Sequence, residues 1–148
     1  PGPQWESTRG AVAFGCLPRG HSAAAVPAAQ LLLAQDTLAN VRLKLVEASS
    51  FRRQLAAQTL RVLVKDPDSN IRQELAGKLF GMLAMPCEED VQLALASDRS
   101  MEVKHAIISS LRFGGTRVSD AVRQQLLEAL DEDIRETVEE MLDSSEED

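Results

Sequence analysis

The chain has 148 residues, enough for one domain, and its apolar residues are mainly Ala and Leu, with one Trp, four Phe and no Tyr. Ala and Leu favour helices, whereas β proteins rely on β-branched and aromatic residues, so this composition argues against a β fold. The formal net charge of −7 argues against sequence-independent binding to nucleic acid, which requires an excess of Lys and Arg.

The first part of the chain differs from the rest in composition. Residues 1–27 hold four of the eight Gly and four of the six Pro, and Pro1–Gly20 shows no sustained helical or strand period. We expect a disordered leader over 1–27, a folded domain over 28–142 and an acidic tail over 143–148. Two bases among small residues leave a transit peptide open as an alternative for the leader.

A unit of about 31 residues recurs after the leader. In each copy an acidic turn is followed by a β-branched residue and a base. The bases are Arg42, Arg72, Lys104 and Arg135, which are 30, 32 and 31 residues apart. Asp36, Asp66 and Asp98 each precede their base by six residues, and Asp131 opens a degenerate fourth copy. Self-similarity at a fixed period is typical of a solenoid.

Each unit has room for two helices, so the sequence predicts four helical hairpins. In chain order they are Ala28–Gln35 with Leu38–Ala48, Phe51–Val64 with Asn70–Leu83, Glu88–Ala96 with Met101–Phe113, and Asp120–Leu130 with Ile134–Leu142. Their predicted starts are marked by Pro27, Ser50, Ser69, Ser100 and Ser119. Apolar residues fall on one face of these helices, as in Ile71, Leu75, Leu79 and Leu83, in Val103, Ile107 and Leu111, and in Ile134, Val138 and Met141.

The repeated acid and base have a structural interpretation. An Asp or Ser before a helix accepts hydrogen bonds from the free N–H groups of its first turn. The base that follows can reach an Asp in its own turn or in a neighbouring one. We therefore interpret Arg42, Arg72 and Lys104 as ties between adjacent repeats, ahead of a role in partner contact.

The repeated Asp-x-x-x-x-[Val/Ile]-[Arg/Lys] motif, placed between the helices of a pair, resembles the HEAT repeat family over about residues 28–142. The resemblance implies an all-α fold, an α-solenoid of about four HEAT-like hairpins. The period is shorter than in typical HEAT units and is similar to that of compact, phycobilisome lyase-like proteins. The stretch Leu33–Leu43 is also similar to repeats in the scaffold subunit of the type 2A protein phosphatase and in regulatory subunits of the type 4 enzyme.

In such stacks the second helices line the concave side, and the turns within hairpins contact partners. Carried onto this sequence, the resemblance implies a protein-binding ridge of Thr37, Asn40, Pro67, Asp68, Asn70, Arg99, Met101 and Glu102, with the bases Lys44 and Lys78. Each residue alone is interpreted more simply as a solvated turn or cap residue. Only as a set on one edge do they indicate a binding surface.

We expect a non-catalytic scaffold or regulatory subunit of the cytoplasm or nucleus, with a Ser/Thr phosphatase catalytic subunit as the first candidate partner. The alternatives are a compact lyase or chaperone for a chromophore protein and a nucleic-acid adaptor. The adaptor would use the strip between Arg42 and Lys78, which holds eight bases and four acids. An exposed apolar face on the first hairpin would also permit self-association.

Candidates for catalysis are few. The two histidines are His21 and His105, no His-Glu pair occurs, and the glycines do not form a phosphate-binding loop. Cys16 and Cys87 are far apart and we expect free thiols. We therefore expect no enzyme activity, no metal, no cofactor and no membrane span. The acidic end, where Ser144 and Ser145 precede acids, is typical of substrates of acidophilic kinases.

Overall fold

The computed structural model describes residues 25–113, 117–128 and 130–146, and all regular secondary structure in these ranges is helical. The helices are α2 (Ala25–Ala34), α3 (Ala39–Ala48), α4 (Ala57–Leu63), α5 (Ser69–Phe80), α6 (Glu89–Ala96), α7 (Met101–Arg112), α8 (Asp120–Glu128) and α9 (Glu132–Glu146). The prediction of an all-α fold is confirmed for the described residues.

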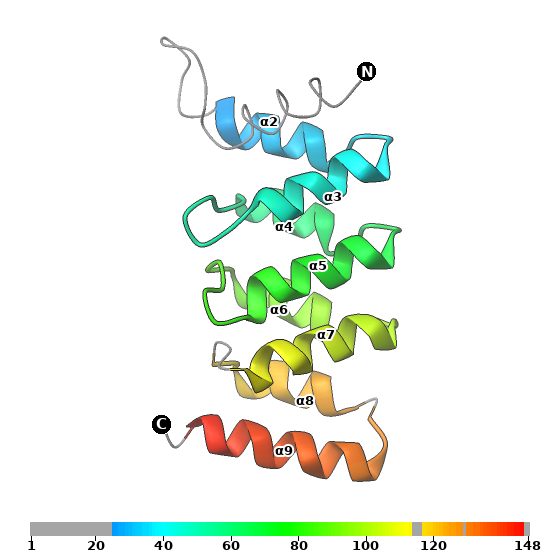
Figure 1. Cartoon of the computed structure of the whole chain (residues 1–148), viewed down its shortest axis with the longest axis vertical. Coiled ribbons are helices and arrows are strands. Elements are labelled where there is room, and N and C mark those ends of the chain that lie inside the picture. The colour runs from blue at the N-terminus through cyan, green and yellow to red at the C-terminus, as the bar shows by residue number, and fades with distance from the viewer. Residues whose placement is uncertain (1–24, 114–116, 129, 147–148) are drawn as a thin grey trace.

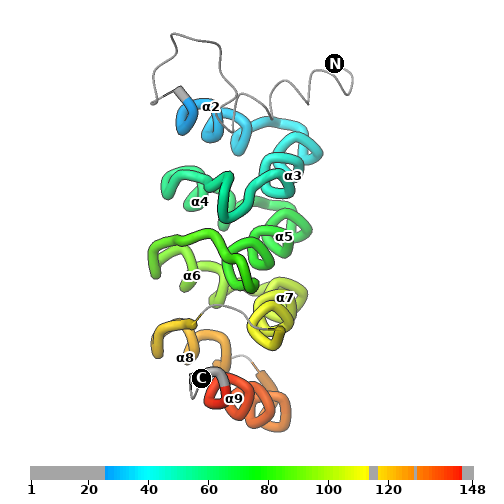
Figure 2. Tube along the Cα trace, turned by 60° about the vertical axis from the view of Figure 1, so that its left-hand side comes forward, coloured from blue at the N-terminus to red at the C-terminus, as the bar shows by residue number. Residues whose placement is uncertain are grey.

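The helices form two layers that run the length of the molecule (Figures 1 and 2). In one layer α3 packs on α5, α5 on α7, and α7 on α9; in the other α2 packs on α4 and α6 on α8. Consecutive helices alternate between the layers, so each second helix lies beside the second helix of the next pair. The buried apolar residues lie between the layers, and Ile71, Leu75 and Leu79 of α5 are fully covered there.

Helix α5 ends earlier than the sequence pattern predicts. It stops at Phe80, which is buried, whereas Leu83 is 79% exposed instead of continuing the apolar face. Gly81 follows in an extended conformation, and a Cβ at this position would lie 2.8 Å from the carbonyl oxygen of Gly77. The chain therefore leaves the helix at Gly81, and the prediction for 81–83 is wrong.

Helix α4 begins six residues later than predicted. Ser50 was expected to cap it, but the Ser50 Oγ accepts hydrogen bonds from the backbone N–H groups of Arg52 and Arg53, at 3.3 and 3.2 Å. A paired backbone bridge between Ser50 and Arg53 completes this turn. A hydroxyl that bonds the following N–H groups competes with helix formation, so Phe51–Ala56 stay outside the helix.

The other predicted helix starts have mixed outcomes. The cap of α5 is Asp68 rather than Ser69, and its carboxylate accepts from the Asn70 N–H at 2.9 Å. Ser119 fits the prediction, because its Oγ accepts from the Val122 N–H at 3.3 Å. Ser100 precedes α7 but makes no side-chain cap, and its hydroxyl donates to Glu102 instead.

The two ends of the described chain also differ from the prediction. Helix α2 already includes Ala25–Pro27, which were assigned to the leader; the rest of the leader lies outside the described residues. Helix α9 continues through Glu146 into the predicted acidic tail. Within α9 the predicted Val138 is buried and Met141 packs partly buried against the core, whereas Ile134 is 44% exposed. Leu142 is buried as well.

Candidate protein-binding surface

The turns within the first three hairpins, 35–38, 64–68 and 97–100, are stacked along one edge of the molecule, which we call the turn edge (Figure 1). The repeated Asp shapes each turn. Carboxylates of Asp36, Asp66 and Asp98 accept hydrogen bonds from the backbone N–H two residues later, in each case at 2.9 Å. A short acidic side chain that bonds its own backbone in this way fixes a tight turn. The same local structure therefore recurs in three consecutive repeats.

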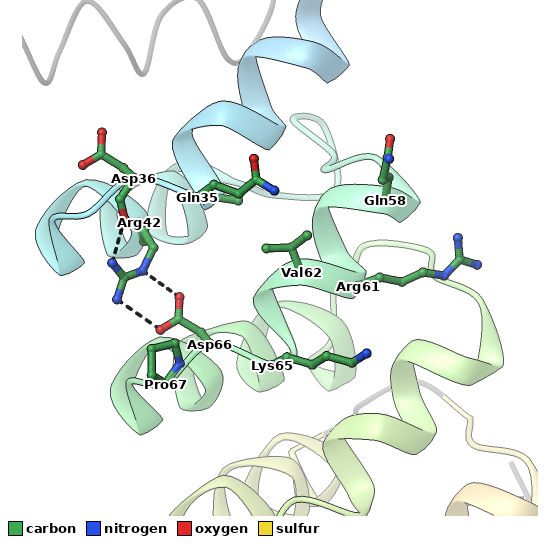
Figure 3. Close-up of a pocket in the computed structure, with 10 residues that line it drawn as sticks. Gln35, Asp36, Arg42, Gln58, Arg61, Val62, Lys65, Asp66 and Pro67 are labelled. Carbon is green, nitrogen blue, oxygen red and sulfur yellow. Dashed lines mark hydrogen bonds and ion pairs between the residues drawn. The ribbon is translucent and has the colours of Figure 1, made fainter.

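The repeated Arg connects each turn to the next. Arg42 donates through Nη1 to the carbonyl of Asp36 in its own turn, at 2.8 Å. Its Nε and Nη2 bind the two carboxylate oxygens of Asp66 in the next turn, at 2.8 and 3.3 Å (Figure 3). Arg72 repeats the arrangement with Asp98, at 2.7 and 3.3 Å, and also donates to the Asp66 carbonyl. We call the pairs Arg42–Asp66 and Arg72–Asp98 the Arg–Asp ladder.

The ladder lies inside the protein surface. The side chains of Arg42 and Asp66 are 13% and 3% exposed, and those of Arg72 and Asp98 are 11% and 6% exposed. Forked Arg–carboxylate pairs with little solvent access hold a fixed geometry. The structural interpretation of these two Arg residues as ties between repeats is confirmed.

The third and fourth bases act differently. Lys104 donates to the carbonyl of Ala96 at the end of α6, at 2.9 Å, and it contacts no described Asp. Arg135 donates through Nε and Nη2 to the Leu127 carbonyl near the end of α8, at 3.0 and 2.9 Å. A Lys ammonium lacks the fork that pairs with a carboxylate while bonding a carbonyl. The predicted tie to a neighbouring Asp is wrong for Lys104, which joins the two helices of its own hairpin.

Two grooves open between successive turns. The first, of about 670 Å³, lies between the α2–α3 and α4–α5 turns, with Ala34 and Val62 as apolar lining and a polar or charged rim (Figure 3). Its other lining residues are Gln35, Asp36, Arg42, Gln58, Arg61, Lys65, Asp66 and Pro67. The second, of about 360 Å³, lies between the α4–α5 and α6–α7 turns. The ladder residues form part of the wall of both grooves.

The structure brings most of the predicted ridge together. Eight residues lie in the turns of the turn edge or in the first turn of the helix that follows: Thr37, Asn40, Pro67, Asp68, Asn70, Arg99, Met101 and Glu102. All are exposed except Asp68, which is half-buried as the cap of α5. The two bases are placed elsewhere. Lys44 is in the middle of α3, and Lys78 is near the far end of α5, where it donates to the carbonyl of Glu47 at 3.0 Å.

The repeat pattern did not predict that the first helix of a pair contributes to the larger groove. Gln58, Arg61 and Lys65 on or after α4 line this groove. Arg61 also binds Asp90 and Glu88 of the next repeat, at 3.0 and 2.6 Å. Its hydrogen bond lowers the pKa of Asp90. This second tie between repeats is largely exposed to solvent.

The basic strip proposed for nucleic acid is not one continuous surface. Arg42 and Arg72 belong to the ladder, Arg61 is paired with two acids, and Lys78 is bonded to a carbonyl. These four of its eight bases are therefore bonded to other groups of the protein. The structure gives no support to a single basic track between Arg42 and Lys78.

The described residues include one thiol, that of Cys87, and one imidazole, that of His105. No three His, Cys, Asp or Glu side chains there converge as metal ligands. Burial, with a smaller contribution from the charge of Asp90, raises the pKa of the Cys87 thiol to about 11. The thiol is therefore protonated at neutral pH and is a poor nucleophile. His105 is exposed on α7.

Comparison with protein-family models, with characterised proteins and with solved structures finds no match to this chain. No helix in the described ranges combines the length and the apolar character required to cross a bilayer.

Proposed function

We propose that this chain is a non-catalytic protein-binding module, an α-solenoid of HEAT-like hairpins whose turn edge contacts the partner. The observation that carries the proposal is the Arg–Asp ladder. It links three consecutive turns through nearly buried ion pairs, while the residues beside it, such as Asn40 and Asn70, remain exposed. A surface held rigid before binding loses little conformational freedom when the partner arrives.

The fold and the sequence period support the solenoid together. Helix pairs alternate between two layers, and each pair corresponds to one unit of about 31 residues in the sequence. A hairpin alone leaves one apolar face uncovered, and stacking covers it. Leu32 on α2 is 71% exposed at the first hairpin of the stack. Self-association through this hairpin stays a further prediction.

The groove beside the first two turns supports the choice of a protein partner. Its apolar centre of Ala34 and Val62, with a rim of amides and charges, suits an exposed side chain or loop of another protein. The resemblance of Leu33–Leu43 makes the catalytic subunits of the type 2A and type 4 phosphatases the first partners to test.

The test measures binding of the full chain to these purified catalytic subunits by biolayer interferometry. The turn variant combines Asn40→Ala, Asn70→Ala and Met101→Ala, which change exposed side chains and leave the ladder and the Asp68 cap intact. The control combines Ser109→Ala, Gln124→Ala and Thr137→Ala, which are exposed in α7, α8 and α9 away from the three turns. We expect the turn variant to bind about tenfold more weakly or worse, and the control to bind like the unchanged chain.

Two outcomes would count against the proposal at different levels. If neither catalytic subunit binds, the phosphatase assignment is wrong. The partners that the turn variant captures from cell lysate are then compared with those that the control captures. If a captured partner binds the turn variant as tightly as the unchanged chain, the turn edge is not the binding surface.

A further inference from the structure

A second edge of the molecule is formed by the loops between hairpins, which we call the loop edge. It comprises the α3–α4 loop (49–56), the α5–α6 loop (81–88) and the described part of the α7–α8 loop (113 and 117–119). These loops are stacked at the end of the second helices opposite to the turn edge (Figures 1 and 2). A helix of 12 residues such as α5 separates the two edges by about 18 Å.

The three loops meet around one cavity of about 440 Å³. Phe51 comes from the first loop, Ala84 to Cys87 from the second, and Arg117 and Ser119 from the third. Leu79, Glu89 and Gln92 complete the lining from α5 and α6. A cavity of about 150 Å³ can hold a benzene ring, so this larger cavity has room for an apolar anchor from outside.

Large apolar side chains are exposed on each of these loops. Phe51 is 54% exposed, Met82 75%, Leu83 79% and Phe113 73%. They are four of the eight large apolar residues that the described chain leaves exposed, although the three loops are a small part of it. Clustered exposure of this kind marks a contact surface, whereas single exposed apolar residues need no explanation.

Exposed bases lie in these loops and at the end of α7. Arg52, Arg53 and Arg112 are exposed, and none forms an ion pair with a carboxylate of the described residues. The Arg112 guanidinium lies 5.7 Å from the centroid of the Phe113 ring, so a charge and an apolar surface are presented together. In contrast, Arg42, Arg61 and Arg72 are all paired with acids of the next repeat.

We propose that the loop edge binds an acidic segment of a partner protein that carries a large apolar side chain. The carboxylates of the segment bind Arg52, Arg53 and Arg112, and the apolar side chain enters the cavity between the loops. Arg and aromatic residues are the types that contribute most to protein interfaces, and charge-assisted bonds orient the segment. This surface is independent of the turn edge.

A peptide fits the loop edge better than an anionic bilayer does. The acidic helix α9 ends at the same edge, and Asp143 in its last turn is exposed (Figure 1). A flat layer of lipid phosphates would meet these acids as well as the bases, whereas a short segment contacts the loops alone. A cavity that admits one side chain also gives no advantage on a bilayer.

The experiment uses the full chain and a fluorescein-labelled synthetic peptide of alternating Glu and Ser with a central Leu-Phe pair, followed by fluorescence anisotropy. We expect saturable binding that weakens at least about tenfold in the Arg52→Glu, Arg53→Glu variant. The Lys65→Glu, Arg99→Glu variant makes the same change of charge at the turn edge, and we expect it to bind the probe unchanged. A peptide with Ser in place of Leu-Phe should bind at least about tenfold more weakly.

Several results would overturn the proposal. One is that the probe does not bind the chain, and another is that the two charge variants weaken its binding equally. A third is that the peptide that lacks Leu-Phe binds as tightly as the probe. Binding to phosphatidylserine vesicles that is lost in Phe113→Ser, without binding of the probe, would assign the edge to a membrane. A dimer in sedimentation that dissociates in the Arg52→Glu, Arg53→Glu variant would assign it to a second copy. Circular dichroism verifies that each variant is folded.

Discussion

At the residue scale, Cys87 shows how its surroundings set its reactivity. Burial raises its pKa from 9.0 to about 11, so the thiolate fraction at pH 8 falls about 100-fold below that of a free thiol. In a Cys16→Ser variant we expect iodoacetamide to modify the native chain about 100-fold more slowly than the same chain in urea. Equal rates in the two states would show that the thiol is not buried in solution.

The same pKa shift predicts how stability depends on pH. A thiol whose folded pKa is raised favours the folded state while it is protonated, and this contribution is complete below pH 9.0. It is lost as pH rises towards about 11. Urea unfolding between pH 8 and pH 11 should therefore show a steeper loss of stability in the unchanged chain than in Cys87→Ala. Parallel curves would contradict the shift.

Thr59 has a buried hydroxyl group without a hydrogen-bond partner in the described structure. The residue is fully buried in α4. Thr59→Val replaces the hydroxyl by a methyl of similar volume, and we expect a gain of about 1 kcal/mol in the free energy of unfolding. Thr37→Val, at an exposed position, is the control and should change stability little. A loss of stability in Thr59→Val would indicate a bonded hydroxyl.

The residues of the turns were predictable because their spacing repeats. Asp36, Asp66 and Asp98 precede their bases by a constant interval, and that interval is what a turn of fixed geometry requires. The contact made by Lys104 was not predictable, because the sequence pattern accepts Lys and Arg at the same position. The planar fork of Arg binds both oxygens of a carboxylate in the next turn while another N–H reaches the carbonyl of its own turn, whereas the compact ammonium of Lys has no such fork.

At the element scale, the glycine within α5 and the glycine that follows this helix have opposite roles. Gly77 is exposed within the helix, and a Cβ there meets no atom within 4 Å, whereas a Cβ at Gly81 would contact the Gly77 carbonyl oxygen at 2.8 Å. We expect Gly77→Ala to raise the free energy of unfolding by about 0.5–1 kcal/mol, because Ala favours the helix. Gly81→Ala should lower it. Urea denaturation checks both, and equal effects of the two changes would contradict the structure.

The boundaries of the helices were the least predictable part of the fold, and this explains why the loop edge was missed. Phe51, Leu83 and Phe113 were all assigned to helices, since apolar residues at the margin of a helical period are normally core. The structure places each of them outside a helix and exposed. The Ser50 turn delays the start of α4 and the close approach at Gly81 ends α5, and neither contact is visible in a hydrophobic pattern.

At the scale of the whole molecule, the two edges use arginine in different ways. On the turn edge Arg42 and Arg72 are bound in the ladder, which holds the stack together, and the exposed residues there are mostly neutral or mixed in charge. On the loop edge Arg52, Arg53 and Arg112 form no ion pair with a described carboxylate and lie beside exposed apolar side chains. One chain of this size can thus present two contact surfaces, separated by the length of its second helices, to two partners.

The ladder also predicts how the repeats depend on one another. Arg72 ties the second repeat to the third, and Arg72→Ala would leave the Asp98 carboxylate, 6% exposed, without its partner. Removing one member of a buried pair costs about 3 kcal/mol, so we expect a loss of that size in the free energy of unfolding. The exposed pair Arg61–Asp90 joins the same two repeats, and Arg61→Ala should cost much less.

Urea denaturation of the two variants makes the comparison directly, with the double variant Arg72→Ala, Asp98→Ala as a further control. Because the double variant leaves no unpaired carboxylate, it should recover part of the stability that Arg72→Ala loses. In Arg72→Ala, amide hydrogen exchange should be faster than in the unchanged chain, both in α5 and in the α6–α7 turn. The Arg72–Asp98 pair holds α5 against this turn, so its loss should affect both. If exchange rises in α5 alone, or if Arg61→Ala is as damaging, the ladder does not couple the repeats.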